Sequence, residues 1–100
     1  MIARVWRGWA ASGEDADAYE AHYRTDVRRE LSKIDGFVEA RLLRREVGGE
    51  VELVSITFFE GLDAVRGFAG DSYETAVVAD AAREVLSRFE DTVAHYDIVT

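Results

Sequence analysis

The middle of the chain carries the pattern that most constrains the fold. Residues 37–45 and 51–59 alternate apolar with polar side chains, and residues 46–50 between them contain the pair Gly48-Gly49. Alternation with a period of two is typical of half-buried strands, and a Gly-Gly pair suits the tight turn of a β-hairpin. The sequence therefore predicts two antiparallel strands in the middle of a sheet.

The flanking segments predict the remaining elements. Residues 2–10 and 93–99 are expected to be outer strands, the first because it is rich in β-branched and aromatic residues. Residues 14–34 are predicted to form a long helix, because apolar side chains recur there every three or four positions. Residues 62–68 predict a short helix, and a further helix begins at Asp80. The apolar stripe of the long helix consists of Tyr19, Tyr23, Val27, Leu31 and Ile34.

Local signals predict where these helices begin and end. Gly36 suits a left-handed cap at the end of the long helix. Asp71 is expected to begin a turn with Glu74 as its capping-box partner, and the helix from Asp80 is expected to continue through Phe89. The element order is β-α-β-β-α-β, which predicts an α+β, ferredoxin-like fold with a four-stranded antiparallel sheet and the helices on one face.

Length and charge limit the classes of function. One hundred residues correspond to a single domain, residues 1–100. Twenty acidic and twelve basic residues give a net charge of −8, which argues against nucleic acid and membrane partners. The chain has no cysteine and no apolar run of transmembrane length, and its first nine residues include two arginines where a signal peptide would be apolar. We expect a cytoplasmic protein.

The two faces of the sheet are predicted to differ. Alternation assigns to the helix side a wholly apolar set, namely Val38, Ala40, Leu42, Val54, Ile56 and Phe58. The opposite, open side then carries Arg4, Trp6, Thr57, Phe59 and His95 among others. Such a mixed face exposes too much apolar surface for a monomer, so we expect a homodimer in which two open faces pack together.

Several segments resemble a known family over nearly the whole chain, from residue 2 to residue 99. They are Val5-Trp6-Arg7-Gly8-Trp9, Ala21-His22-Tyr23, Ile34-Asp35-Gly36-Phe37, residues 55–68 with Phe68-Ala69-Gly70-Asp71, and His95-Tyr96-Asp97-Ile98-Val99. In these segments the chain is similar to the antibiotic biosynthesis monooxygenase (ABM) proteins of the dimeric α+β barrel superfamily. The resemblance implies a homodimer with one pocket per subunit. Relatives include cofactor-free monooxygenases of anthrone-type polyketides, quinol monooxygenases, haem-degrading monooxygenases and isomerases.

Some positions depart from the family pattern. Phe59 stands where relatives often carry tryptophan, and Val78, Ala79 and Asp80 stand where close relatives have an aromatic pair and a proline. Haem-degrading relatives use a histidine near the second helical region as iron ligand, and residues 61–94 contain none. With two histidines in all and no dinucleotide fingerprint, we expect no metal and no cofactor.

His95 is the predicted catalytic base. It precedes Asp97 by two positions, which places both side chains on one strand face about 6.6 Å apart. Imidazole can take a proton near neutral pH, and the carboxylate could orient it. Tyr73 and Arg83 are the predicted polar helpers, which would bind a substrate oxygen and stabilise an anion. Alternatively, these three residues are structural, at the sheet, the surface or the dimer interface.

The predicted substrate-binding residues are aromatic and polar. Trp6 and Phe59 would form a slot for a flat ring, with Thr57 on the same face and His22 at the rim. The competing interpretation is core and interface packing for the aromatic residues and partial solvation for His22.

The function predicted from the sequence is a cofactor-independent monooxygenase of a small aromatic or polyketide-type substrate. Two alternatives stay open, a non-catalytic homodimer that binds a small hydrophobic molecule and an isomerase or cyclase that consumes no oxygen. The sequence leaves undecided whether the chain is an enzyme.

Overall fold

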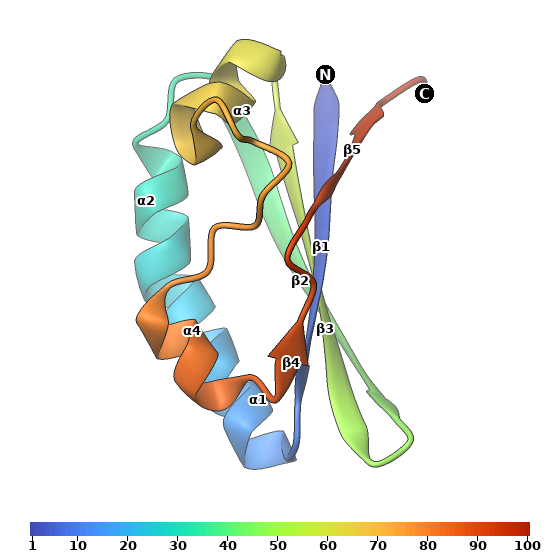
Figure 1. The fold of residues 1–100 in the computed structure, drawn as a ribbon. Coiled ribbons are helices and arrows are strands. Elements are labelled where there is room, and N and C mark those ends of the chain that lie inside the picture. Colours follow the sequence, from blue (N-terminus) through green and yellow to red (C-terminus); the bar gives the residue numbers. More distant parts are fainter.

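Helices and sheet form two layers, with all the helices on one side of the sheet (Figure 1). A computed structural model describes residues 1–100. The strands are β1 (Ile2–Ala10), β2 (Phe37–Val47), β3 (Glu50–Phe59), β4 (Arg88–Phe89) and β5 (Ala94–Asp97). The helices are α1 (Gly13–His22), the π-helical turn η1 (Tyr23–Val27), α2 (Arg28–Ser32), α3 (Leu62–Ala69) and α4 (Asp80–Val85).

The sheet has the strand order of a ferredoxin-like fold. The order is β2-β3-β1-β4, β5 also pairs with β1, and every pairing is antiparallel. The predicted α+β class and the placement of the helices on one face of the sheet are therefore confirmed. The last strand differs, because two short strands share the edge of β1. The helix that begins at Asp80 ends at Val85 rather than continuing to Phe89, since Arg88 and Phe89 pair with Trp9 and Gly8.

The predicted long helix is present and contains one unexpected turn. α1, η1 and α2 follow one another without a break, with the π-helical turn in the middle. The Ser12 hydroxyl caps the start by accepting a hydrogen bond from the Asp15 amide at 3.1 Å. Gly36 follows the helix with φ of 87°, as predicted, and a Cβ at this position would lie 2.8 Å from the Cβ of Ala64. The glycine therefore permits both the turn and the contact with α3.

The predicted capped turn at Asp71 is wrong. Residues 70–79, here called the strap, form no helix and run from α3 to α4 across the sheet (Figure 1). Hydrogen bonds to the last part of the chain hold the strap in place. They join the Ala76 amide to the Asp91 carbonyl at 2.8 Å and the Val93 amide to the Glu74 carbonyl at 2.9 Å. This tertiary pairing satisfies backbone groups that a capped helix would otherwise use.

The hairpin turn decides which side chains face the helices. Val47 pairs with Glu50, so the connection has two residues, Gly48 and Gly49, with φ of 57° and 84°. Positive φ at both positions is characteristic of a type I′ turn. The sequence predicts a loop of five residues here, residues 46–50. Shortening it to two shifts the register by one residue and moves the side chains of one strand to the other face.

The predicted assignment of the faces is therefore wrong for most of the sheet. Ala40 and Leu42 face the helices as expected, but their β3 partners are Thr57 and Ser55. The set predicted to stay open lies together on the helix side, in register across three strands: Arg4, Trp6, Thr57, Phe59 and His95. The side chains on the open side are Val54, Ile56 and Phe58, which were predicted to face the helices. For β1, β3 and β5 the grouping was right and the side was wrong, whereas β2 was assigned to the right side and grouped with the wrong half of β3.

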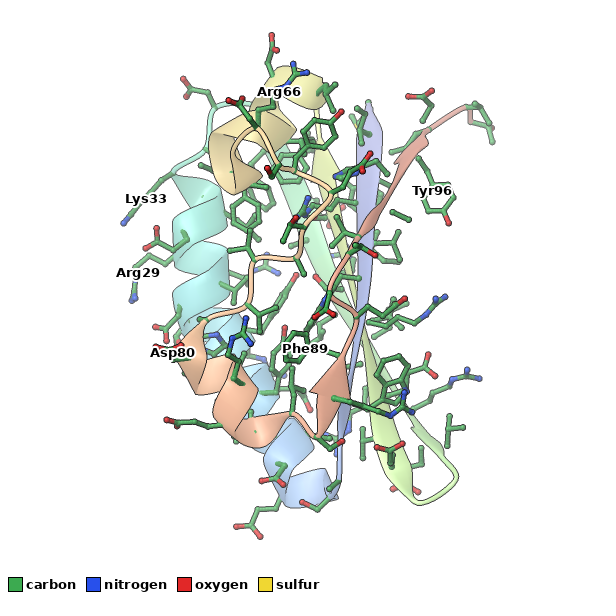
Figure 2. All side chains as sticks on the ribbon, in the orientation of Figure 1. Arg29, Lys33, Arg66, Asp80, Phe89 and Tyr96 are labelled. Carbon is green, nitrogen blue, oxygen red and sulfur yellow. The ribbon has the colours of Figure 1, made fainter.

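The apolar core lies between the two layers. Its fully buried side chains include Leu31 from α2, Leu53 and Phe59 from β3, and Val65 from α3. Figure 2 shows Phe89 between α4 and the sheet, Arg29 and Lys33 pointing outward from the long helix, and Tyr96 on the open side. The core thus joins every helix to the same face of the sheet.

Two leucines test this register. Leu53 has no exposed surface, whereas 49% of Leu43 is exposed. We expect Leu53→Ala to lower the free energy of unfolding by about 2–5 kcal/mol because it leaves a cavity, and Leu43→Ala by about 0.5 kcal/mol. Urea unfolding at two protein concentrations measures both and separates folding from association. Equal losses at both positions would contradict the register.

Candidate functional site

A cavity of about 160 Å³ lies between the sheet and the helices. β1 and β3 form its floor, the long helix forms one wall, and the end of the strap with α4 forms the other. Eleven of its seventeen lining residues are hydrophobic, so a ligand would meet mainly apolar surface. A cavity of roughly 150 Å³ accommodates a benzene ring in other proteins. The space therefore suits one aromatic ring.

Arg4 places a buried positive charge on the floor of this cavity. Its side chain extends from β1, and 5% of the residue is exposed. The guanidinium donates to the Tyr73 carbonyl at 2.5 Å and the Thr75 carbonyl at 3.3 Å. Burial lowers the pKa of Arg4 to about 10, which leaves it charged at neutral pH. None of its hydrogen-bond partners is a carboxylate, and it forms no salt bridge with an acidic residue.

His95 forms a hydrogen bond with Arg4 and does not itself line the cavity. Its Nε2 lies 3.0 Å from the Arg4 Nη1, and because a guanidinium can only donate, the histidine nitrogen accepts. Burial, and then the charge of Arg4, lower the pKa of His95, while Glu74 acts in the opposite direction. The Tyr73 ring packs against the imidazole edge to face, with centroids 5.4 Å apart. The histidine is thus held neutral, with its Nε2 lone pair directed at Arg4.

Two buried tyrosines line the helix wall. The Tyr23 hydroxyl lies 3.1 Å from the Ser55 hydroxyl on β3, and the Tyr19 ring packs 6.2 Å from the Trp6 ring. Burial raises the pKa of both tyrosines, and in Tyr19 the neighbouring Tyr23 adds to the effect. Both hydroxyls therefore stay protonated at neutral pH. They can form hydrogen bonds to a ligand but cannot serve as bases there.

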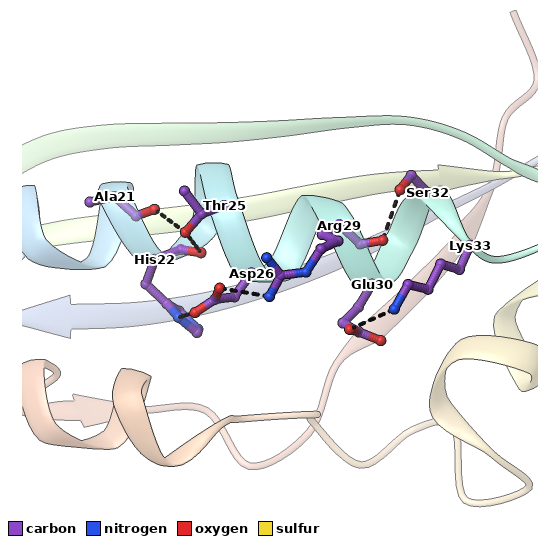
Figure 3. A network of polar contacts seen from close by, with 8 residues as sticks. All are labelled: Ala21, His22, Thr25, Asp26, Arg29, Glu30, Ser32 and Lys33. Carbon is purple, nitrogen blue, oxygen red and sulfur yellow. Dashed lines mark hydrogen bonds and ion pairs between the residues drawn. The ribbon is translucent and has the colours of Figure 1, made fainter.

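A histidine–carboxylate pair lies at the helical rim of the cavity (Figure 3). His22 and Asp26 both line the cavity, one turn apart on the long helix. The Nδ1 of His22 lies 3.1 Å from Oδ2 of Asp26, and the other oxygen of Asp26 accepts from Arg29 at 3.0 Å. Only 10% of the His22 side chain is exposed. The pair joins the cavity to solvent through the half-exposed carboxylate.

The structure brings together only some of the predicted site residues. Trp6, Thr57 and His22 line the cavity. His95 and Tyr73 lie behind Arg4 and do not line it.

Phe59 and Arg83 lie elsewhere. Phe59 is fully buried in the core, with its ring 6.0 Å from that of Phe37 and 6.2 Å from that of Phe68. Arg83 is exposed on α4, with its guanidinium 5.1 Å from the centre of the Phe89 ring. Neither residue lines the cavity.

Sequence reasoning missed Arg4 and Asp26 as site residues. The sequence predicts that Arg4 shares a sheet face with Trp6, but it assigns that face to the open side, so the burial of Arg4 was not expected. The sequence does contain a signal for Asp26, since it follows His22 by four positions and this spacing places both residues on one side of a helix.

The structure contains no group of three or more histidine, cysteine, aspartate and glutamate side chains arranged to hold a metal ion. None of its helices has the length and apolar character needed to span a membrane.

Comparison with known sequence families and with curated proteins finds no match. Solved structures do match. SnoaB, a cofactor-independent oxygenase from Streptomyces nogalater, superposes with a TM-score of 0.64 at 22% identity, over 99% of this chain and 93% of SnoaB. The chain has the ABM fold.

Two further structures share the ABM fold. A Bacillus cereus protein assigned as an antibiotic biosynthesis monooxygenase matches with a TM-score of 0.66 at 15% identity, over 99% of this chain and 91% of that one. A variant of MhuD with two manganese protoporphyrin IX molecules bound per active site matches with a TM-score of 0.67 at 16% identity, over 100% and 96%. Proteins with the ABM fold thus include a cofactor-independent oxygenase and a protein that binds manganese protoporphyrin IX.

The contact between His95 and Arg4 predicts a pH dependence of stability. Because the pKa of His95 is lowered on folding, the unfolded chain binds its proton more readily. The contribution is complete above the ordinary pKa of 6.5 and is lost as pH falls toward the lower pKa of the folded state. We expect His95→Gln, which retains an acceptor for Arg4, to flatten the fall in melting temperature between about pH 8 and pH 5. Identical slopes for both proteins would contradict this role.

Proposed function

We propose that the chain is a cofactor-independent monooxygenase of a small aromatic substrate that ionises inside the cavity. The observation that carries this proposal is Arg4, a buried cation without a carboxylate partner on the floor of an apolar cavity. A buried charge without a counterion is costly, and an anion formed beside it would be stabilised strongly. The likeness to SnoaB supports the reaction class.

The chemistry would belong to the substrate. Removal of a proton from a phenol or from a carbon beside a carbonyl leaves an electron-rich anion, with its oxygen held by the guanidinium of Arg4. This anion reacts with dioxygen. When a CH₂ group becomes a carbonyl, one oxygen atom stays in the product and the other leaves as water with the two hydrogens. No further reductant is needed.

The cavity walls indicate a flat substrate. Trp6 from the sheet and Tyr19 from the helix layer both line the cavity, with their rings packed 6.2 Å apart, and Phe68 lines it from α3. Such rings prefer offset or tilted stacking with an aromatic ligand. Since the volume suits one ring, the remaining rings of a polycyclic substrate would extend through the opening. The cavity does not fit a porphyrin of four pyrrole rings, and residues 61–94 offer no histidine as an axial ligand.

The predicted site residues take different roles in this proposal. Trp6 and Thr57 would contact the substrate, and His95 and Tyr73 would position Arg4 rather than act as base and donor. Arg83 and Phe59 have no part in the chemistry, because neither lines the cavity.

We also propose a homodimer through the open face of the sheet. This face carries half-exposed apolar side chains in the centre of the sheet and exposed ones toward its edges. Arg7 and Glu52 form a charged contact at 3.9 Å among them. A surface of this kind is typical of an interface with a polar component. The apolar members are Val5, Trp9, Leu43, Val54, Ile56, Phe58 and Tyr96.

Oxygen uptake tests the proposed activity. We expect purified protein to consume oxygen with anthrones or hydroquinones above a protein-free blank, and Arg4→Met to lower kcat about 100- to 1,000-fold because the anion loses its donor. Arg83→Met is the matched control, since it removes an exposed arginine away from the cavity. Circular dichroism verifies the fold of each variant.

The outcomes separate the alternatives. Product without oxygen uptake would indicate an isomerase or cyclase. Ligand binding without turnover would indicate a binding protein, and equal losses in both variants would contradict the role of Arg4.

Light scattering tests the dimer. We expect a mass of twice 11.2 kDa for the wild type. Phe58→Glu should give the monomer mass, because it places a charge in the centre of the open face. Glu60→Gln, at an exposed position beyond the end of β3, serves as the control. A wild-type mass near 11.2 kDa at micromolar concentration would contradict the interface.

A further inference from the structure

The rim of the cavity holds a second ionisable group that the proposed function does not yet use. His22 lines the cavity from the helix layer, whereas Arg4 lines it from the sheet. A substrate between the layers would contact the cation on one side and the imidazole on the other. The two groups have complementary chemistry, since one stabilises an anion and the other can accept a proton.

Asp26 determines which nitrogen of His22 is available. The carboxylate oxygen Oδ2 lies 3.1 Å from Nδ1, so Nδ1 carries the proton of the neutral ring and donates it to the carboxylate. Nε2 then keeps its lone pair. No residue of the chain forms a hydrogen bond with this nitrogen. A histidine oriented by a carboxylate in this way is the arrangement that general bases use.

The helix geometry fixes the pair at the cavity. η1 begins directly after His22 and contains Asp26, and π-helical turns occur frequently at functional sites. The Thr25 hydroxyl, in this turn, donates to the Ala21 carbonyl at the end of α1 at 2.9 Å. Arg29 donates to the second oxygen of Asp26 at 3.0 Å (Figure 3), which orients the carboxylate.

We infer that His22 is the catalytic base of the site and that Asp26 is its positioning residue. The inference rests on the proposed function. In the step assigned to it, the O–H bond of a phenolic or enolic substrate breaks, the proton moves to Nε2 of His22, and the electron pair stays on the oxygen beside Arg4. Charge is conserved, because a neutral substrate and a neutral imidazole become an anion and an imidazolium.

Several other ionisable groups line the cavity with His22. The other titratable or charged residues that line the cavity are Arg4, Tyr19, Tyr23, Asp26 and Glu30. The tyrosines stay protonated and so do not take the proton from a substrate. The strap and α4 contribute only Val77, Val78, Ala79 and Ala82 to this wall. An acidic rim also repels substrates that arrive as anions, so the neutral acid is the form that enters.

The test follows the proton during binding of a simple probe. Phenol labelled with carbon-13 at the hydroxyl-bearing carbon is added to protein with nitrogen-15 in its histidine rings. The experiment runs at about pH 8, above the ordinary pKa of histidine (~6.5) and below that of a phenol (~10). The carbon shift distinguishes phenol from phenolate, and the nitrogen shifts distinguish imidazole from imidazolium. We expect bound phenolate together with imidazolium at His22 and neutral His95.

Three variants test the roles of His22 and Asp26 separately. His22→Gln should reduce the bound phenolate at least about tenfold relative to phenol, because the proton acceptor is gone. Asp26→Asn should lower the imidazolium fraction of His22 while His95 stays unchanged. Arg24→Gln is the control, since Arg24 forms an exposed contact with Glu20 on the same helix outside the cavity and should reproduce the wild type.

Each outcome decides a separate point. Bound phenolate with neutral His22 overturns the assignment of the base and leaves the role of Arg4 intact. Neutral phenol in the wild-type cavity, or no binding, overturns the proposed function and this inference with it. An equal response in Arg24→Gln and Asp26→Asn overturns the role of the carboxylate.

Discussion

The site depends on one buried guanidinium. Arg4 donates to the carbonyls of Tyr73 and Thr75, so it holds the strap against β1 and forms the charged floor of the cavity at the same time. The neutral imidazole of His95 completes its set of acceptors. Since backbone carbonyls and imidazole satisfy hydrogen bonds without cancelling a full charge, the cavity retains its attraction for an anion. Stability and candidate chemistry thus share the same contacts.

The second constraint is the two-residue turn at Gly48-Gly49. Because side chains alternate along a strand, the length of this turn selects which half of β3 faces the helices. The turn pairs Thr57 with Ala40 and Ser55 with Leu42, so both β3 residues face the helices. In the separate register of β1 and β3, Thr57 lies beside Arg4 and Ser55 beside Trp6. The same register leaves Val54, Ile56 and Phe58 on the open side. One local geometry therefore determines both the polar floor of the cavity and the apolar face of the proposed dimer.

The fold leaves the chemistry to the cavity residues. Proteins of the ABM fold include a cofactor-independent oxygenase and a protein that binds manganese protoporphyrin IX, so the architecture is compatible with different chemistry. In this chain the helix layer contributes His22 and Asp26 and the sheet contributes Arg4. A cavity suited to one aromatic ring between a cation and an imidazole favours acid–base chemistry on a small ionisable ring over the binding of a macrocycle.

The sequence by itself determined the element order, the long helix and the left-handed conformation of Gly36, because periodicity and turn residues act over a few positions. Periodicity also determined which residues of β1, β3 and β5 share one face, namely Arg4, Trp6, Thr57, Phe59 and His95. Tertiary structure decided which side of the sheet that face occupies, since a one-residue shift in the register of β2 and β3 inverts it. It also replaced the predicted turn at Asp71 with the strap, whose partners lie about 15 to 20 residues further along the chain. Contacts over such separations, and the burial of Arg4 that follows from them, leave no local pattern in the sequence.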